Sequence, residues 1–163
     1  NLSILKNIIM EDLSALSQVA EFHHTFKHPI VEQAAIPSKV RSKLRIDLIA
    51  EELKELQEAV DNNDLVEVAD ALCDLQYVLA GAVLEFGLGA KFKALFDEVH
   101  RSNMSKACKT VAEAEATIAH YKQKDNVDAY FKEIEGLFLV YRKGDDKTLK
   151  SINYSPADIK GLL

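Results

Sequence analysis

Residues 51–74 read EELKELQEAVDNNDLVEVADALCD, and this stretch decides the fold. Its first half places apolar residues at helical spacing beside closely spaced glutamates, and its second half returns to the same spacing. Between the two halves, Asn62-Asn63-Asp64 is typical of a turn. The sequence therefore predicts two helices that are joined by a short turn and lie antiparallel to each other.

Both helices extend beyond this stretch. Ser38 is a plausible N-cap for the first, which we expect to run to about residue 62. The second is nearly continuous apolar sequence over residues 65–86, and Gly87 and Gly89 suit a left-handed C-cap after it. It is the predicted central helix, with the deepest burial in the chain.

The remaining segments predict three more helices and a small β-structure. A helix over residues 10–26 ends before the His28-Pro29 step, and others cover residues 90–105 and 110–122. Aromatic and β-branched residues then flank Glu135-Gly136, which predicts a hairpin, with a third short strand near 148–152 and a helical turn after Pro156. The expected fold is mainly α: a bundle core of four to five helices with a small C-terminal β-hairpin.

Length and composition narrow the class of protein. At 163 residues, the chain fits one domain, residues 1–163, in which a hairpin-containing extension covers about 108–152. A net charge of −6 argues against binding nucleic acid through its phosphates. The longest apolar stretch, residues 75–84, is too short to cross a bilayer, and residues 1–10 do not resemble a secretory signal. We therefore expect a cytoplasmic protein without a membrane contact, in which Cys73 and Cys108 are reduced thiols.

Acidic residues follow one side of each predicted helix. On the first helix, Glu51, Glu52 and Glu55 share an arc of roughly 100°, and Glu58 falls beside them. Leu53 and its apolar neighbours lie next to that arc, so we expect it to border the core. The four carboxylates thus lie on one edge.

On the second helix, Glu67, Asp70 and Asp74 form a stripe about 60° wide within otherwise apolar sequence. Buried carboxylates without partners cost several kcal/mol each, roughly, so this stripe requires cations. Lys54 is the only basic residue between residues 51 and 74. Carboxylate oxygens without histidine favour Mg²⁺ or Mn²⁺ over zinc or di-iron, so we expect a metal between the two helices. Taken alone, glutamates such as those of residues 51–58 more often form a solvated helix face than a metal site.

The ordered acidic motifs resemble those of the all-α nucleoside triphosphate pyrophosphohydrolases, the MazG-like and phosphoribosyl-ATP pyrophosphohydrolase-like group. The pattern EExxE followed by ExxD is present at residues 51–55 and 67–70. The segment EVHRSNMSK, residues 98–106, is similar to one bacterial branch of that group, as is the ending NYSPADI at residues 153–159. The likeness covers roughly residues 22–106 and the tail.

The resemblance implies a helical core that forms a homodimer or a dimer of dimers, with Mg²⁺ as cofactor and Mn²⁺ as a substitute. By this resemblance, the metal ligands are Glu52, Glu55, Glu67 and Asp70, and Glu51 is a further ligand or the base that orients water. The residues that contact phosphate or base are Arg101, Asn103 and Lys106. Glu58 and Asp74 are possible supporting acids. Without the resemblance, Arg101 and Lys106 would more simply offset the dipole at a helix end. His23 and His24 resemble the group's first helix but equally fit a surface.

Three functions follow from these expectations. The first is Mg²⁺-dependent hydrolysis of a nucleoside triphosphate, a (d)NTP, to the monophosphate and pyrophosphate, in a nucleotide-pool or house-cleaning role. The second is a non-catalytic helical interaction protein whose acids balance basic residues of another subunit. The third is a phosphoribosyl-ATP pyrophosphohydrolase, which we rank below the first.

Overall fold

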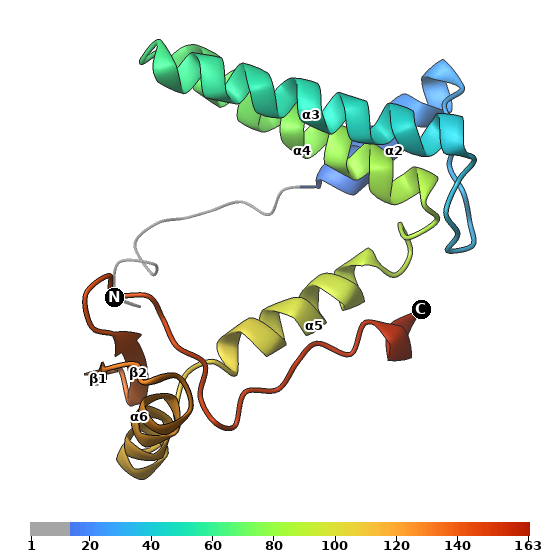
Figure 1. Ribbon diagram of the computed structural model, residues 1–163. Coiled ribbons are helices and arrows are strands. Elements are labelled where there is room, and N and C mark those ends of the chain that lie inside the picture. Colours follow the sequence, from blue (N-terminus) through green and yellow to red (C-terminus); the bar gives the residue numbers. More distant parts are fainter. Residues whose placement is uncertain (1–13) are drawn as a thin grey trace. The chain divides into compact units, whose positions relative to one another are not determined.

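The computed structural model describes residues 14–163 and divides into two compact units, Asn1–Phe92 and Lys93–Leu163. The elements follow one another along the chain (Figure 1) as α2 Ala15–Phe26, α3 Lys39–Asp61, α4 Leu65–Glu85, α5 Phe92–Met104, α6 Val111–Asp125, β1 Ala129–Ile134, β2 Leu137–Arg142 and the 3₁₀ turn η1 Lys160–Leu162. This confirms the predicted fold class. Single-domain organisation stays a prediction. Among the described residues, no helix combines the length and the apolar character that crossing a membrane requires.

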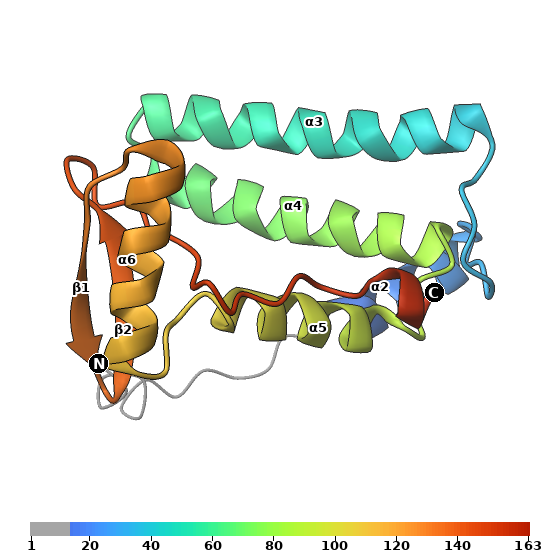
Figure 2. The ribbon, with the colours of Figure 1, turned by 60° about the horizontal axis from the view of Figure 1, so that its bottom comes forward.

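Helices α3 and α4 form the predicted antiparallel pair (Figure 2). The side chain of Ser38 accepts a hydrogen bond from the backbone of Arg41 at the start of α3. Asp64 caps α4 by accepting from the backbone N–H groups of Val66 and Glu67, at 3.1 and 3.2 Å. Asn63 takes the left-handed conformation, with φ 52°, which a tight reversal allows for asparagine. The turn expected from Asn62-Asn63-Asp64 is confirmed.

Helix α2 packs on α4 through a small apolar core made of Val19, Ala80 and Leu84. It ends at Phe26, because Lys27 is left-handed and His28 N–H bonds back to the carbonyl of His23. The expected helix over residues 10–26 is confirmed from Ala15 onward, and residues 10–13 lie outside the described part of the chain.

Helix α4 has more buried residues than any other described helix, as predicted, but its burial is uneven in the single chain. Residues 80–85 at its C-terminal end are largely buried, but Leu65, Val66 and Leu72 in the N-terminal half are 80%, 76% and 52% exposed. Leu53 on α3 is exposed as well, so the acidic edge of α3 does not border a core there. The reason is that α2 covers only the later turns of α4, where Ala80 and Leu84 lie.

A buried ionic cluster joins the three helices of the first unit. Glu85 of α4 is 2% exposed, and its carboxylate accepts bonds from the guanidinium groups of Arg41 and Arg45, both on α3. His23 of α2 is buried beside them, and its Nδ1 lies 2.8 Å from the carbonyl of Pro29. An added Cβ at Gly81 would crowd both Arg45 and His23, so this position requires a very small residue.

The second unit contains the hairpin, which packs against α6. Strands β1 and β2 are antiparallel, with Phe131 opposite Val140, and Glu135 and Gly136 take the positive φ values of a two-residue turn. Val140 belongs to a core shared with Cys108 and Ala114 of the α6 region. The third strand expected near 148–152 is wrong: Thr148 forms only an isolated bridge to Tyr141. The Leu149 N–H still donates to the Val140 carbonyl of β2. Beyond it, the Ser151 N–H bonds to the Lys106 carbonyl and the Ile152 N–H to the Thr117 hydroxyl, so the chain leaves the sheet.

Candidate functional site

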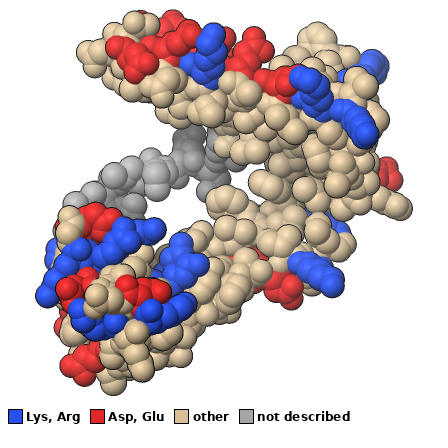
Figure 3. Space-filling model, viewed as in Figure 1, with Lys and Arg blue, Asp and Glu red and all other residues tan. Residues whose placement is uncertain are grey.

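The predicted acids of α3 and α4 lie on the two facing helices of the first unit. Space-filling spheres show acidic side chains gathered near the α3–α4 turn (Figure 3). Glu51, Glu55, Glu67, Asp70 and Asp74 are exposed, whereas Glu52 is only partly exposed. The helix pair therefore presents a carboxylate-rich edge whose least accessible member is Glu52.

Glu52 carries the clearest electrostatic sign of this arrangement. Its Oε2 atom is buried and has no hydrogen-bond partner. Burial raises the pKa of Glu52, and the negative charges of Glu55 and Asp74, then of Glu51 and Asp70, raise this pKa further. Since Asp70 and Asp74 come from α4, the acids of the two helices are close enough to repel one another.

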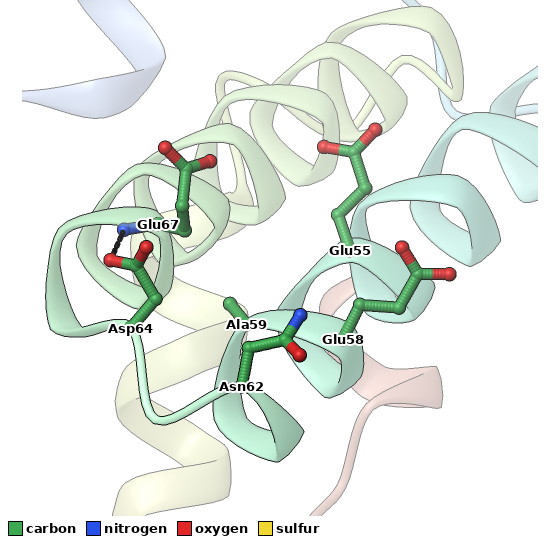
Figure 4. A pocket seen from close by; sticks show the side chains of 6 residues that line it. All are labelled: Glu55, Glu58, Ala59, Asn62, Asp64 and Glu67. Carbon is green, nitrogen blue, oxygen red and sulfur yellow. Dashed lines mark hydrogen bonds between the residues drawn. The ribbon is translucent and has the colours of Figure 1, made fainter.

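A cavity of about 350 Å³ opens next to this edge, at the turn between the helices. Its lining residues are Glu55, Glu58, Ala59, Asn62, Asp64 and Glu67 (Figure 4). The carboxylates of Glu55 and Glu67 project to the same side of the helix pair, one from each helix. The cavity thus places two predicted metal ligands at one opening.

Glu58 differs from Glu55 in its partner. Lys54 lies one turn before it, and the Lys54 Nζ is 3.2 Å from a carboxylate oxygen of Glu58. Both side chains are largely exposed, so this pair stabilises little. It does give Glu58 a positive neighbour, which leaves Glu55 as the better candidate for an oxygen ligand.

The carboxylates fit a hard divalent cation in their chemistry, but their side chains are not arranged around one. Within residues 14–163, no three side chains of His, Cys, Asp or Glu converge closely enough to hold a metal ion. The unpartnered Glu52 Oε2 and the mutual repulsion of the acids create a demand for positive charge, and all the available donors are oxygen. Because Glu55, Glu67 and Asp70 are exposed, their side chains are free to change rotamer when a cation binds.

The second unit contains the other predicted site residues, and they separate into two groups. Lys106 Nζ donates to Asn103 Oδ1 at 2.8 Å. Arg101 bonds instead to both carboxylate oxygens of Glu98, at 2.7 Å each, and to the carbonyl of Pro156 at 3.1 Å. Residues two apart on a helix do not face each other, so Arg101 and Asn103 lie on different sides of α5.

The histidines and cysteines take roles outside the acidic edge. His23 belongs to the buried cluster around Glu85, while His24 and His100 are exposed. Cys73 is exposed and Cys108 is buried, and both are free thiols, as expected. The Cys108 sulfur lies 3.5 Å from the Thr117 hydroxyl, inside the core of the second unit.

Sequence reasoning missed the two polar residues Asn62 and Asp64, which line the cavity together with Ala59. Both were interpreted only as turn residues. An aspartate directly before an apolar helical run is a helix-start pattern, so Asp64 could have been placed at the beginning of α4 from the sequence. Its position beside Glu67 follows from that cap (Figure 4).

Comparison with known proteins identifies a family whose model matches this chain. A family model described as phosphoribosyl-ATP pyrophosphohydrolase matches residues 19–103, which is more than half of the chain. An uncharacterized protein of Acanthamoeba polyphaga mimivirus is 39% identical over 94 residues, covering 54% of this chain. The alignment covers 37% of that relative, so the chain spans little more than a third of its length. The region matched by the family model contains both acidic motifs, at residues 51–55 and 67–70.

Proposed function

Because the chain belongs to the phosphoribosyl-ATP pyrophosphohydrolase family, within the MazG-like all-α superfamily, we propose that it is a Mg²⁺-dependent nucleoside triphosphate pyrophosphohydrolase. The observation that carries this proposal is the position of Glu52. Its buried, unpartnered oxygen lies among acids of both helices, where a divalent cation would remove the repulsion.

In this proposal the metal is held by Glu52, Glu55, Glu67 and Asp70. Asp74 adds a negative charge next to Glu52, which strengthens the attraction of the site for a cation. When bound, Mg²⁺ supplies charge neutralisation for the triphosphate and polarises the attacking water. Glu51 orients that water and accepts its proton. The water oxygen bonds to the α-phosphorus, the bridging α–β P–O bond breaks, and pyrophosphate leaves with the bonding electrons.

The substrate has two candidates of equal standing. A nucleoside triphosphate and phosphoribosyl-ATP both contain the α–β phosphoanhydride, and the family match is consistent with either. The acidic edge supplies charge chemistry common to all triphosphates and does not discriminate between the two. We carry forward the ordinary nucleotide, in a cytoplasmic nucleotide-pool role, as the broader class of substrate. Asn103 and Lys106 are proposed as phosphate contacts.

The test is pyrophosphate release from a panel of NTPs, dNTPs, modified nucleotides and phosphoribosyl-ATP, with Mg²⁺ or with chelator. We expect metal-dependent release from at least one member and a loss of at least roughly 100-fold in Asp70→Asn, since changing even the residues that support a metal ligand costs about 10–100-fold. Release from phosphoribosyl-ATP alone would select the family's named substrate. A folded protein that is inactive on every member, with metal present, would favour the interaction-protein alternative.

We further propose that the chain forms a homodimer through the exposed apolar surface of α4, defined by Leu65, Val66 and Leu72. A groove of about 400 Å³ between α2 and α4, which Leu72 and Tyr77 also line, continues this surface. Exposed apolar areas of this kind in a folded chain support a protein interface. A dimer of dimers is the larger alternative.

The Leu72→Asp variant should therefore shift the protein from dimer to monomer in sedimentation velocity, because a charge would be buried without a partner at the interface. Val111→Asp on α6 is the matched control, since Val111 is also an exposed apolar residue but lies in the second unit. A wild-type protein that is already monomeric at high concentration would contradict the proposed dimer.

A further inference from the structure

The C-terminal segment, residues 151–158, runs along α5 in the second unit and is bonded to it at several points (Figures 1 and 2). The Asp158 N–H donates to Glu98 at 2.8 Å, and the Pro156 carbonyl accepts from Arg101 at 3.1 Å. The Ser155 N–H donates to the Ser105 hydroxyl at 2.9 Å. Glu98, Arg101 and Ser105 lie about one turn apart, so the segment follows a single face of the helix.

Glu98 and Arg101 form the centre of this attachment. Arg101 uses Nε and Nη2 for the two Glu98 oxygens, and Nη2 also bonds to the Pro156 carbonyl. The Arg101 guanidinium and the Asp158 N–H lower the pKa of Glu98 to about 2, so its carboxylate stays charged at neutral pH.

The same segment also forms a hydrogen bond with the backbone just after α5 ends. The Ser151 N–H donates to the Lys106 carbonyl at 3.0 Å, directly after the anchored Ser105. From this fixed backbone, Lys106 Nζ reaches Asn103 Oδ1. Asn103 lies about 160° around the helix from Arg101, given roughly 100° per residue. Arg101, which pairs with Glu98, and Asn103, which pairs with Lys106, therefore lie on nearly opposite sides of α5.

We propose that Glu98 and Arg101 are positioning residues that clasp the C-terminal segment onto α5, so that the Lys106–Asn103 pair, and not Arg101, meets the substrate phosphate. The phosphate contact rests on the proposed function; the clasp itself does not. Arg101 already makes a bidentate pair with the Glu98 carboxylate, so a phosphate would have to compete with this ion pair and with the Pro156 carbonyl.

Amide hydrogen exchange on the full-length chain tests the clasp without any substrate. Arg101→Gln and Glu98→Gln should each raise exchange at Ser155 and Asp158 by about 10-fold, because each removes a charged hydrogen bond that fixes the segment. Lys106→Gln should leave both amides unchanged, as should Lys93→Gln, which alters only an exposed pair with Asp97 on the same helix. Unchanged exchange in Arg101→Gln would overturn the proposal.

The Michaelis constant for a hydrolysed triphosphate separates the two possible roles of Arg101. If Arg101 acts through the clasp, Glu98→Gln and Arg101→Gln both raise KM about 10-fold with kcat unchanged, and the double variant is no worse than either. If Arg101 binds phosphate directly, Glu98→Gln frees it and lowers KM, which would refute the clasp. Should the wild type hydrolyse nothing, the proposed function fails, while hydrogen exchange still decides the clasp.

Discussion

Glu52→Gln should make the metal-free protein more stable while it abolishes hydrolysis. In the wild type, the Glu52 carboxylate is held among like charges with one oxygen buried and unpartnered. A neutral amide of the same shape removes the repulsion, and it can donate to a neighbouring carboxylate. Relief of about 1 kcal/mol, the size expected for a buried unsatisfied group, corresponds to a rise in Tm of roughly 2–5 °C.

The pH dependence of this effect follows from the raised pKa of Glu52. The folded state binds the Glu52 proton more tightly than the unfolded state, so the associated stability is present below about pH 4.5. It is lost as the pH rises from there through the higher folded pKa. The advantage of Glu52→Gln should therefore appear at neutral pH and disappear in acid.

Thermal unfolding with chelator and with Mg²⁺, followed by circular dichroism, measures this prediction. Mg²⁺ should raise the Tm of the wild type by more than that of Glu52→Gln, because the variant has lost a ligand. Asp61→Asn is the matched control: it is an exposed acid on the same helix, which accepts a bond from Gln57. A variant that is less stable than the wild type without metal, or that keeps full activity, would remove Glu52 from the site.

The acidic edge could be predicted from the sequence because it depends on local periodicity. A turn at residues 62–64 between two helical patterns is enough to make the acids of both helices face each other. Which carboxylate becomes buried depends on side-chain packing, which periodicity does not describe, and the pairing of Glu58 with Lys54 was not anticipated either. The general location was therefore predictable, but the particular state of Glu52 was not.

The contacts that the sequence did not predict are those between residues far apart along the chain. Glu85 ends an apolar helix, and nothing local indicates that Arg41 and Arg45, some forty residues earlier, bind it. The clasp between Glu98 and Asp158 spans sixty residues in the same way. The expected strand near Thr148 failed for a related reason: after Leu149, the N–H groups of Ser151 and Ile152 bond to the Lys106 carbonyl and the Thr117 hydroxyl, which lie far away along the chain.

Replacing Glu85 by alanine should be the most destabilising single change in the first unit. Removal of this carboxylate leaves Arg45, whose side chain is 7% exposed, and Arg41 without their buried counter-charge. Loss of one partner from a buried ion pair costs about 3–5 kcal/mol, against a total stability of roughly 5–15 kcal/mol for a typical domain. We expect a correspondingly large drop in the urea midpoint of the helical signal. Asp47→Ala, which removes an exposed pair with Lys43 on α3, should cost less than about 0.5 kcal/mol.

Acid titration gives the second half of this prediction. Burial would raise the pKa of Glu85, but the hydrogen bonds from Arg41 and Arg45 outweigh it and lower this pKa. The wild type therefore keeps the stability that this carboxylate contributes above about pH 4.5, the ordinary pKa of a glutamate, and loses it as the pH falls through the lower folded pKa. Glu85→Ala has no such carboxylate, so it should not show this loss of stability in acid. Burial also lowers the pKa of His23, so stability should already decline below about pH 6.5 in both proteins. Equal urea midpoints for Glu85→Ala and Asp47→Ala would show that the three helices are held together by their apolar contacts and not by this cluster.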